Sequence, residues 1–115
     1  MKEFIQKEKH SFKFAFNGLW LLLKEKHFVI HLIFAFLAIT IGFIQQISQT
    51  EWFIITICIT MVLVAEAINT AIEKIVDYIS LEKTTEAKII KDIGAGMVLL
   101  TAISSGIIGA IIFFL

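Results

Sequence analysis

Three long apolar runs are the feature that most constrains what this chain can fold into. They cover residues 28–44, 52–79 and 93–115, the second with a polar end, and they raise the hydrophobic fraction of the 115 residues to 58%, against roughly 45–50% in soluble domains. A bilayer core requires about 17–25 mostly apolar helical residues. Because lipid offers the backbone no hydrogen bonds, only helices or closed barrels cross it. The sequence therefore predicts an all-α membrane protein with three transmembrane helices in a single domain, residues 1–115.

The positions of the lysines predict how these helices are oriented. Lys24 and Lys26 precede the first span, and Lys83, Lys88 and Lys91 lie between the second and third, whereas segment 45–51 has no lysine. Cytoplasmic loops are enriched in lysine and arginine. We therefore expect the N-terminus and segment 80–91 to be cytoplasmic and the C-terminus to lie outside. The second helix, about 40 Å long, should then extend from the membrane on the cytoplasmic side.

The N-terminal segment, residues 3–24, is predicted to form an amphipathic helix on the membrane surface. Its apolar residues fall mostly along one helical stripe and its lysines lie elsewhere, which is typical of helices that rest on a bilayer. The stripe consists of Phe4, Ile5, Phe12, Phe16 and Leu19, with Lys2, Lys9 and Lys13 outside it. A helix packed on other protein would show the same pattern.

Small residues occur at regular intervals in the third span. Ala102, Gly106 and Ala110 are spaced by one helical turn, with Ser105 and Gly109 beside them. This spacing lets helices approach closely in lipid. Three spans in one small chain can hardly enclose a polar site, so we expect an oligomer. Alternatively, these residues only pack the helices of one subunit.

The stretch EAINTAIEKIVD, residues 66–77, carries polar groups into the second span. Because a helix turns 100° per residue, Glu66, Asn69, Glu73 and Asp77 fall within about 80° of arc, along about 16 Å of helix. Polar groups within spans normally face a protein interior or a water-filled site. Solvated acids at an interfacial helix end would explain Asp77 but not Glu66. We therefore predict that this face belongs to a functional site.

Further charged residues stand near the same cytoplasmic boundary. Glu25 precedes the first span, and the segment KIIKD, residues 88–92, precedes the third. Carboxylates brought together can bind Mg²⁺, which leaves positions for nucleotide phosphates, while a nearby lysine neutralises phosphate charge. A deeper carboxylate could take a proton from an alcohol. These are the parts of a phosphoryl-transfer site, although the sequence has neither the Walker phosphate loop nor the protein-kinase motifs. The equal numbers of lysines and acidic residues, ten of each, argue against nucleic acid as a partner.

The motif EAINTAIEKIVD is followed by AKIIKDIGAGMVLL and preceded by NGLWLLLKEKHFVIH. Together these segments resemble the signature of the small prokaryotic membrane lipid kinases, the diacylglycerol and undecaprenol kinases, over residues 12–112. The resemblance implies ATP-dependent phosphorylation of the hydroxyl of a membrane lipid alcohol, with Mg²⁺ as cofactor. It also implies a homotrimer of three-span subunits in the bacterial inner membrane, with active sites near the cytoplasmic face, so that lipid, ATP, bilayer and further copies of the chain are the partners.

On the lipid side of the site, the resemblance implies that Glu66 is the general base on the hydroxyl and that Asn69 helps to order the site. His31, in the segment EKHFVIH, resembles the form typical of the undecaprenol kinases, so undecaprenol is favoured over diacylglycerol as substrate. A packed neutral imidazole is the alternative for this residue. The family often uses a basic residue of the surface helix as well, and the options here are Lys7, Lys9 and Lys13.

On the nucleotide side, the resemblance implies that Glu25 and Glu73 hold the metal of Mg-ATP. Lys91 and Asp92 match the pair at the nucleotide, with Lys91 on the phosphates.

Two other functions fit parts of the pattern. A small proton-coupled transporter could use one embedded Glu, but such proteins generally have four spans and need no row of acidic groups reaching into the cytoplasm. A structural or assembly subunit without chemistry would leave Glu66, Glu73 and Lys91 freely replaceable.

Overall fold

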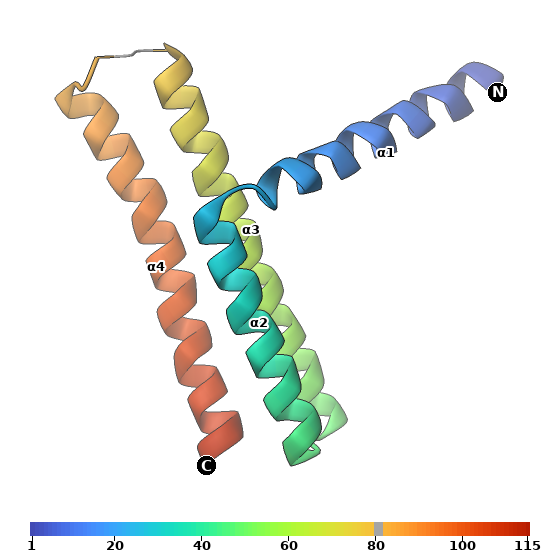
Figure 1. Ribbon diagram of the computed structural model, residues 1–115, viewed down its shortest axis with the longest axis vertical. Coiled ribbons are helices and arrows are strands. Elements are labelled where there is room, and N and C mark those ends of the chain that lie inside the picture. The colour runs from blue at the N-terminus through green and yellow to red at the C-terminus, as the bar shows by residue number, and fades with distance from the viewer. Residues whose placement is uncertain (80–81) are drawn as a thin grey trace.

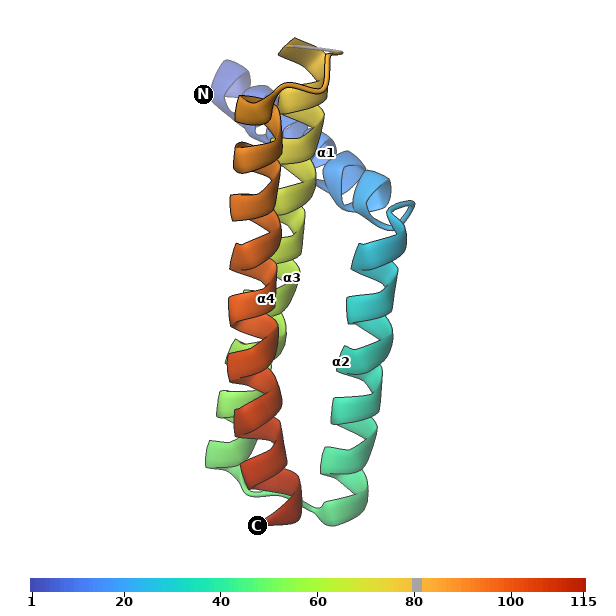
Figure 2. The same cartoon turned by 90° about the vertical axis from the view of Figure 1, so that its left-hand side faces the viewer.

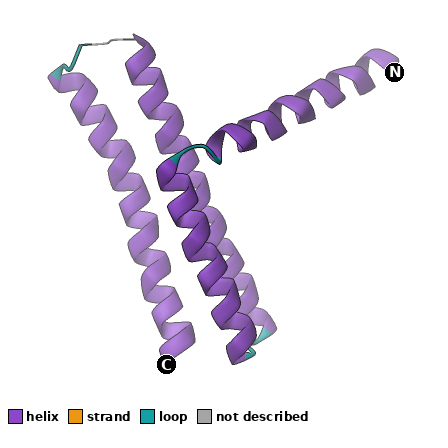
Figure 3. Ribbon diagram, viewed as in Figure 1, coloured by secondary structure: helices purple, strands orange, loops and turns teal. Residues whose placement is uncertain are grey.

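The computed structural model describes residues 1–79 and 82–115, and the described chain consists of four helices joined by short segments (Figure 3). These are α1 (Lys2–Leu22), α2 (Lys26–Gln45), α3 (Gln49–Ile79) and α4 (Thr85–Phe114). Helices α2, α3 and α4 are each long and apolar enough to cross a membrane. The predictions of an all-α chain and of three long apolar helices are therefore confirmed. Ser80 and Leu81, in the predicted polar turn, lie outside the described residues.

Local side chains determine where two of the helices begin. At the start of α3, the Ser48 amide donates to Glu51 Oε1 at 3.0 Å and the Glu51 amide donates to Ser48 Oγ at 3.2 Å, a reciprocal capping box. At the start of α4, Thr84 Oγ1 accepts a hydrogen bond from the Ala87 amide at 3.1 Å. Because of this cap, α4 begins at Thr85, ahead of the apolar run at residue 93, and the segment with Lys88 and Lys91 is helical.

Helices α2 and α3 form an antiparallel hairpin, and α4 returns alongside α3, so that the C-terminus lies at the same end as the α2–α3 turn (Figures 1 and 2). Helix α4 packs mainly on α3, whereas α2 and α4 contact each other much less. Their far ends are joined by a hydrogen bond from Gln45 Nε2 to the Phe113 carbonyl, at 3.0 Å. The bundle therefore has α3 at its centre.

Helix α1 leaves the bundle at its junction with α2 and projects sideways (Figure 1). None of its residues is buried. Helices α2, α3 and α4 also expose many large apolar side chains, such as Phe36 and Phe43 of α2 at 70% each. Lipid tails are as apolar as these side chains, so such exposure is favourable in a bilayer and unfavourable in water.

The buried interior is small and contains an unusual share of polar groups. Ile55, Cys58 and Val98 are buried apolar residues, and Glu66 and Asn69 are buried to the same degree. Burial of a polar group costs free energy unless it is hydrogen-bonded or paired. The fold thus concentrates its polar groups where α3 faces its two neighbours.

Candidate active site

The polar face of α3 lies between α2 and α4. Glu66 is only 5% exposed, and its Oε2 atom lies 3.5 Å from Nε2 of His31, in the second turn of α2. Glu66 is also within electrostatic range of Glu25, Glu73 and His27. Since a buried carboxylate needs a polar partner, His31 supplies the contact that lets Glu66 remain inside the bundle.

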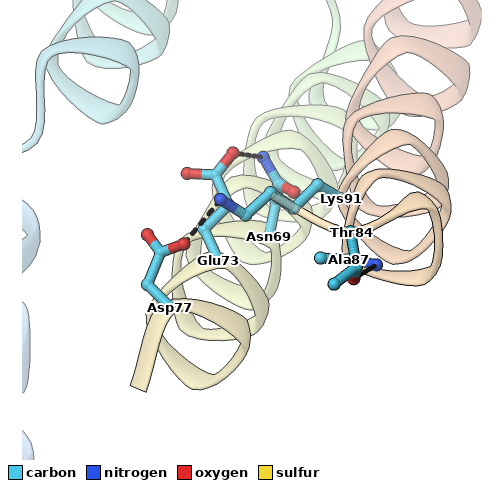
Figure 4. Close-up of polar contacts among 6 residues, drawn as sticks. All are labelled: Asn69, Glu73, Asp77, Thr84, Ala87 and Lys91. Atoms are coloured by element: carbon cyan, nitrogen blue, oxygen red, sulfur yellow. Dashed lines mark hydrogen bonds and ion pairs between the residues drawn. The ribbon is translucent and has the colours of Figure 1, made fainter. Parts of the chain in front are cut away.

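Asn69 connects the buried part of the site to its outer part. Its Nδ2 atom makes a long contact of 3.5 Å to Oε1 of Glu73, one turn further along α3 (Figure 4). Asn69 is 7% exposed, and among the described residues its Oδ1 is the one buried side-chain acceptor without a hydrogen-bond partner. The side-chain amide of Asn69 therefore contacts Glu73 through its Nδ2 atom, and its Oδ1 atom is free to accept a hydrogen bond.

Gly94 is a site residue that the sequence motifs did not single out. A Cβ atom added at this position would overlap Asn69 Oδ1 and would lie 3.4 Å from Asn69 Cγ. Real Cβ atoms essentially never come as close to another atom as this one would come to Asn69 Oδ1, so only glycine allows α4 to approach Asn69 this closely. The sequence did contain a signal for this close approach: a glycine two residues after Asp92, within a segment whose pattern is otherwise typical of a helix.

The charged groups of the outer site are paired with one another. Lys91 Nζ on α4 lies 2.6 Å from Asp77 Oδ1 on α3 (Figure 4), and Lys88 Nζ lies 2.6 Å from Asp92 Oδ2 on the same helix. Both pairs are substantially exposed, so each contributes only about 0–1 kcal/mol to stability. These ion pairs can be exchanged for contacts to a ligand at little cost.

A polar pocket of about 440 Å³ lies between the end of α3 and the start of α4. Asp77, Lys88, Lys91 and Asp92 are among the residues that line it. The structure thus brings Lys91 and Asp92 to one pocket, as partners of Asp77 and Lys88 respectively.

Glu25 caps the start of α2 with an extended backbone, φ −86° and ψ 124°. Its carboxylate lies 3.2 Å from Nζ of Lys74, a residue of the EAINTAIEKIVD segment to which no role had been assigned. The side chain of Glu25 is 37% exposed and that of Lys74 69%, so this ion pair also contributes little to stability.

The carboxylates fit a magnesium ion that is completed by phosphate oxygens rather than one enclosed by protein. Within residues 1–79 and 82–115, no three His, Cys, Asp or Glu side chains converge on one point. Mg²⁺ is usually held by one or two carboxylates together with phosphates and water. Glu25 and Glu73 carry the hard oxygen donors that Mg²⁺ prefers, and both side chains are accessible to solvent.

Comparison with known proteins gives a consistent result. Residues 13–113 match the family model described as prokaryotic diacylglycerol kinase. The chain is 38% identical over 104 residues to the undecaprenol kinase of Bacillus subtilis, covering 90% of this chain and 85% of that protein. It is 32% identical over 101 residues to the diacylglycerol kinase of a Synechocystis strain, covering 86% of this chain and 58% of that protein.

Proposed function

The chain belongs to the prokaryotic diacylglycerol kinase family, whose members are lipid kinases, and on that premise we propose that it transfers the γ-phosphoryl group of ATP to the hydroxyl of undecaprenol, with diacylglycerol as the second candidate acceptor. The family membership confirms the resemblance drawn from the sequence motifs and the expectation of a lipid kinase. Neither relative supports the proton-coupled transporter. Undecaprenol is favoured because His31 fits that branch and because the undecaprenol kinase shares the higher identity of the two.

The observation that carries the proposal is the buried carboxylate of Glu66 at the end of an apolar environment. A lipid alcohol presents its hydroxyl at such a boundary, and Glu66 is the group that would accept the hydroxyl proton as the oxygen attacks phosphorus. His31 Nε2, 3.5 Å from Glu66 Oε2, would orient the carboxylate and contact the alcohol. Asn69 would order the site by holding Glu73.

The outer part of the site would bind Mg-ATP. Glu25 and Glu73 would hold Mg²⁺, which when bound neutralises charge on the transferred phosphoryl group. Lys91 would exchange its contact with Asp77 for a phosphate oxygen, and Asp92 would contact the nucleotide. In this proposal the lipid hydroxyl attacks the γ-phosphorus directly and in line, and no phosphoenzyme forms.

The assembly and its placement are part of the same proposal. We expect a homotrimer in the bacterial inner membrane. The N-terminus and the segment before α4 should lie on the cytoplasmic side, because the lysines gather there. Helix α1 would lie on the cytoplasmic surface of the bilayer. The exposed Phe12, Phe16 and Leu19 of its apolar stripe, at 54–67%, support this placement, and packing on another subunit is the alternative.

The test is an assay of the purified chain with labelled ATP and Mg²⁺, in which undecaprenol, diacylglycerol and ceramide are presented separately in detergent micelles. Preferential labelling of undecaprenol supports the proposal, and labelling of none of the three contradicts it. Glu66→Gln should keep the folded oligomer and lose turnover, since an amide cannot accept the proton. Wild-type turnover by that variant would refute Glu66 as the base.

A further inference from the structure

Lys74 of α3 is a charged residue that the proposed mechanism leaves without a role. At about 100° per residue, it lies about 80° from Glu66 around the helix, whereas Asn69 lies about 60° to the opposite side. Asn69 faces α4, where it approaches Gly94. Lys74 faces α2, where its Nζ atom lies 3.2 Å from Oε1 of Glu25. The polar face of α3 is therefore bordered on the α2 side by an ion pair.

The ion pair between Lys74 and Glu25 does little to hold α2 and α3 together. The side chain of Lys74 is 69% exposed and that of Glu25 is 37% exposed, and pairs this accessible to water add little to stability. The two helices bury apolar side chains of their own, such as Phe28 of α2 and Ile55 of α3. What Lys74 changes is therefore the charge around Glu25 rather than the strength of the helix packing.

Glu25 belongs to a group of carboxylates that repel one another. Glu66 lies within electrostatic range of both Glu25 and Glu73, and like charges at such range disfavour each other. Of the two carboxylates proposed to hold Mg²⁺, Glu73 contacts the neutral amide of Asn69 and forms no ion pair within residues 1–79 and 82–115. Glu25 is paired with Lys74. Lys74 thus supplies a positive charge to the proposed metal ligands before any metal binds.

The ammonium group of Lys74 can leave Glu25 without movement of either helix. A lysine is a strongly hydrated point charge on a flexible four-carbon stem, and this side chain is already mostly in water. Mg²⁺ binds a carboxylate oxygen at about 2.0–2.1 Å, so an ammonium group left on the same oxygen would stand within about 5 Å of the metal and repel it. The ammonium and the metal therefore exclude each other at Glu25.

We propose that Lys74 is a positioning residue that acts through Glu25 and competes with the metal for it, an inference that rests on the proposed kinase function. Its ammonium group neutralises Glu25 until Mg-ATP binds and then turns into solvent. A metal ion alone has to displace the ammonium, whereas Mg-ATP also gains phosphate contacts elsewhere in the site. The ion pair therefore favours metal that arrives with the nucleotide.

The test compares three variants of the full chain in detergent micelles. Lys74→Met removes the charge from an unbranched side chain, and Lys74→Arg keeps the charge. Lys26→Met is the matched control, because Lys26 is exposed and follows Glu25 directly in the chain but forms no ion pair with the described residues. The measurement is equilibrium binding of a labelled, non-hydrolysable ATP analogue, once in saturating Mg²⁺ and once with the metal chelated.

In Mg²⁺, Lys74→Met should bind the analogue about two- to fivefold more tightly than wild type, since fivefold corresponds to about 1 kcal/mol, the upper value for an exposed ion pair. With the metal chelated, it should bind no more tightly than wild type, because loss of a lysine only weakens the attraction for phosphate. Lys26→Met should tighten binding in neither condition. Lys74→Arg should bind in Mg²⁺ as wild type does or more weakly, because a guanidinium can hold a carboxylate through two hydrogen bonds.

The opposite results separate this role from the kinase function. If the wild type phosphorylates lipid but Lys74→Met binds the analogue in Mg²⁺ no more tightly than wild type, Lys74 does not compete with the metal and the kinase function stands. Weaker binding by Lys74→Met both with and without Mg²⁺ would make Lys74 a phosphate contact instead. If Lys26→Met tightens binding as much as Lys74→Met, the ion pair is not the cause. If the wild type binds no nucleotide and phosphorylates no lipid alcohol, the proposed function fails and the role of Lys74 fails with it.

Discussion

Gly94→Ala is the substitution for which the structure makes the sharpest prediction. The new Cβ would overlap Asn69 Oδ1 and would stand 3.8 Å from Ile72 Cγ2. Asn69 is buried, so relief of the contact requires either that its amide rotates away from Glu73 or that α4 moves outward. Both responses change the position of groups that the proposed mechanism uses.

The magnitude follows from two opposing contributions to stability. Overpacking a close contact costs about 1–3 kcal/mol, whereas Gly to Ala within a helix gains about 1 kcal/mol, so the net loss should be about 0–2 kcal/mol. The effect on activity should be larger, because a displacement of about 1 Å in an active site can cost about 100-fold in rate. We expect kcat for Gly94→Ala to fall roughly 10- to 100-fold.

Gly96→Ala is the matched control, since a Cβ there meets nothing within 4 Å and the position is exposed. Its activity should remain within about twofold of wild type. The assay is steady-state phosphorylation of lipid by the purified proteins, with kcat and the KM for Mg-ATP determined separately and thermal stability followed alongside. If Gly94→Ala has wild-type kinetics and gains as much stability as Gly96→Ala, the close approach to Asn69 is not a constraint.

Three further predictions concern the charged groups. Glu73→Gln should shift the Mg²⁺ dependence of the reaction to higher concentration, with partial rescue there; an unchanged dependence would exclude Glu73 as a metal ligand. Lys91→Met should raise the KM for ATP about 10-fold or more, as loss of a charge-assisted phosphate contact does, whereas Lys88→Met should change it little, and equal effects would argue against a specific role for Lys91. Lys74→Met should leave thermal stability within about 1 kcal/mol and lower the Mg²⁺ concentration required, because it removes a cation beside Glu25; a higher requirement would contradict this.

Hydropathy and helical periodicity were sufficient to predict much of the fold. The all-α class and the three long apolar helices follow from local composition, because backbone groups in lipid must form hydrogen bonds within each segment. The same periodicity places Glu66, Asn69 and Glu73 on one face of α3. In the structure, this face lies between α2 and α4. The motifs around these residues also led to the lipid kinase family.

Only the tertiary structure decided which groups meet across helices. The pairing of Lys91 with Asp77, the contact of Lys74 with Glu25 and the approach of Gly94 to Asn69 depend on the rotation and spacing of packed helices. These quantities are set by ridges and small residues along whole interfaces, so they cannot be read from any one segment. The polar pocket beside Lys91 has the same origin: a sequence specifies which residues are charged, whereas their distance from the facing helix determines whether they enclose space.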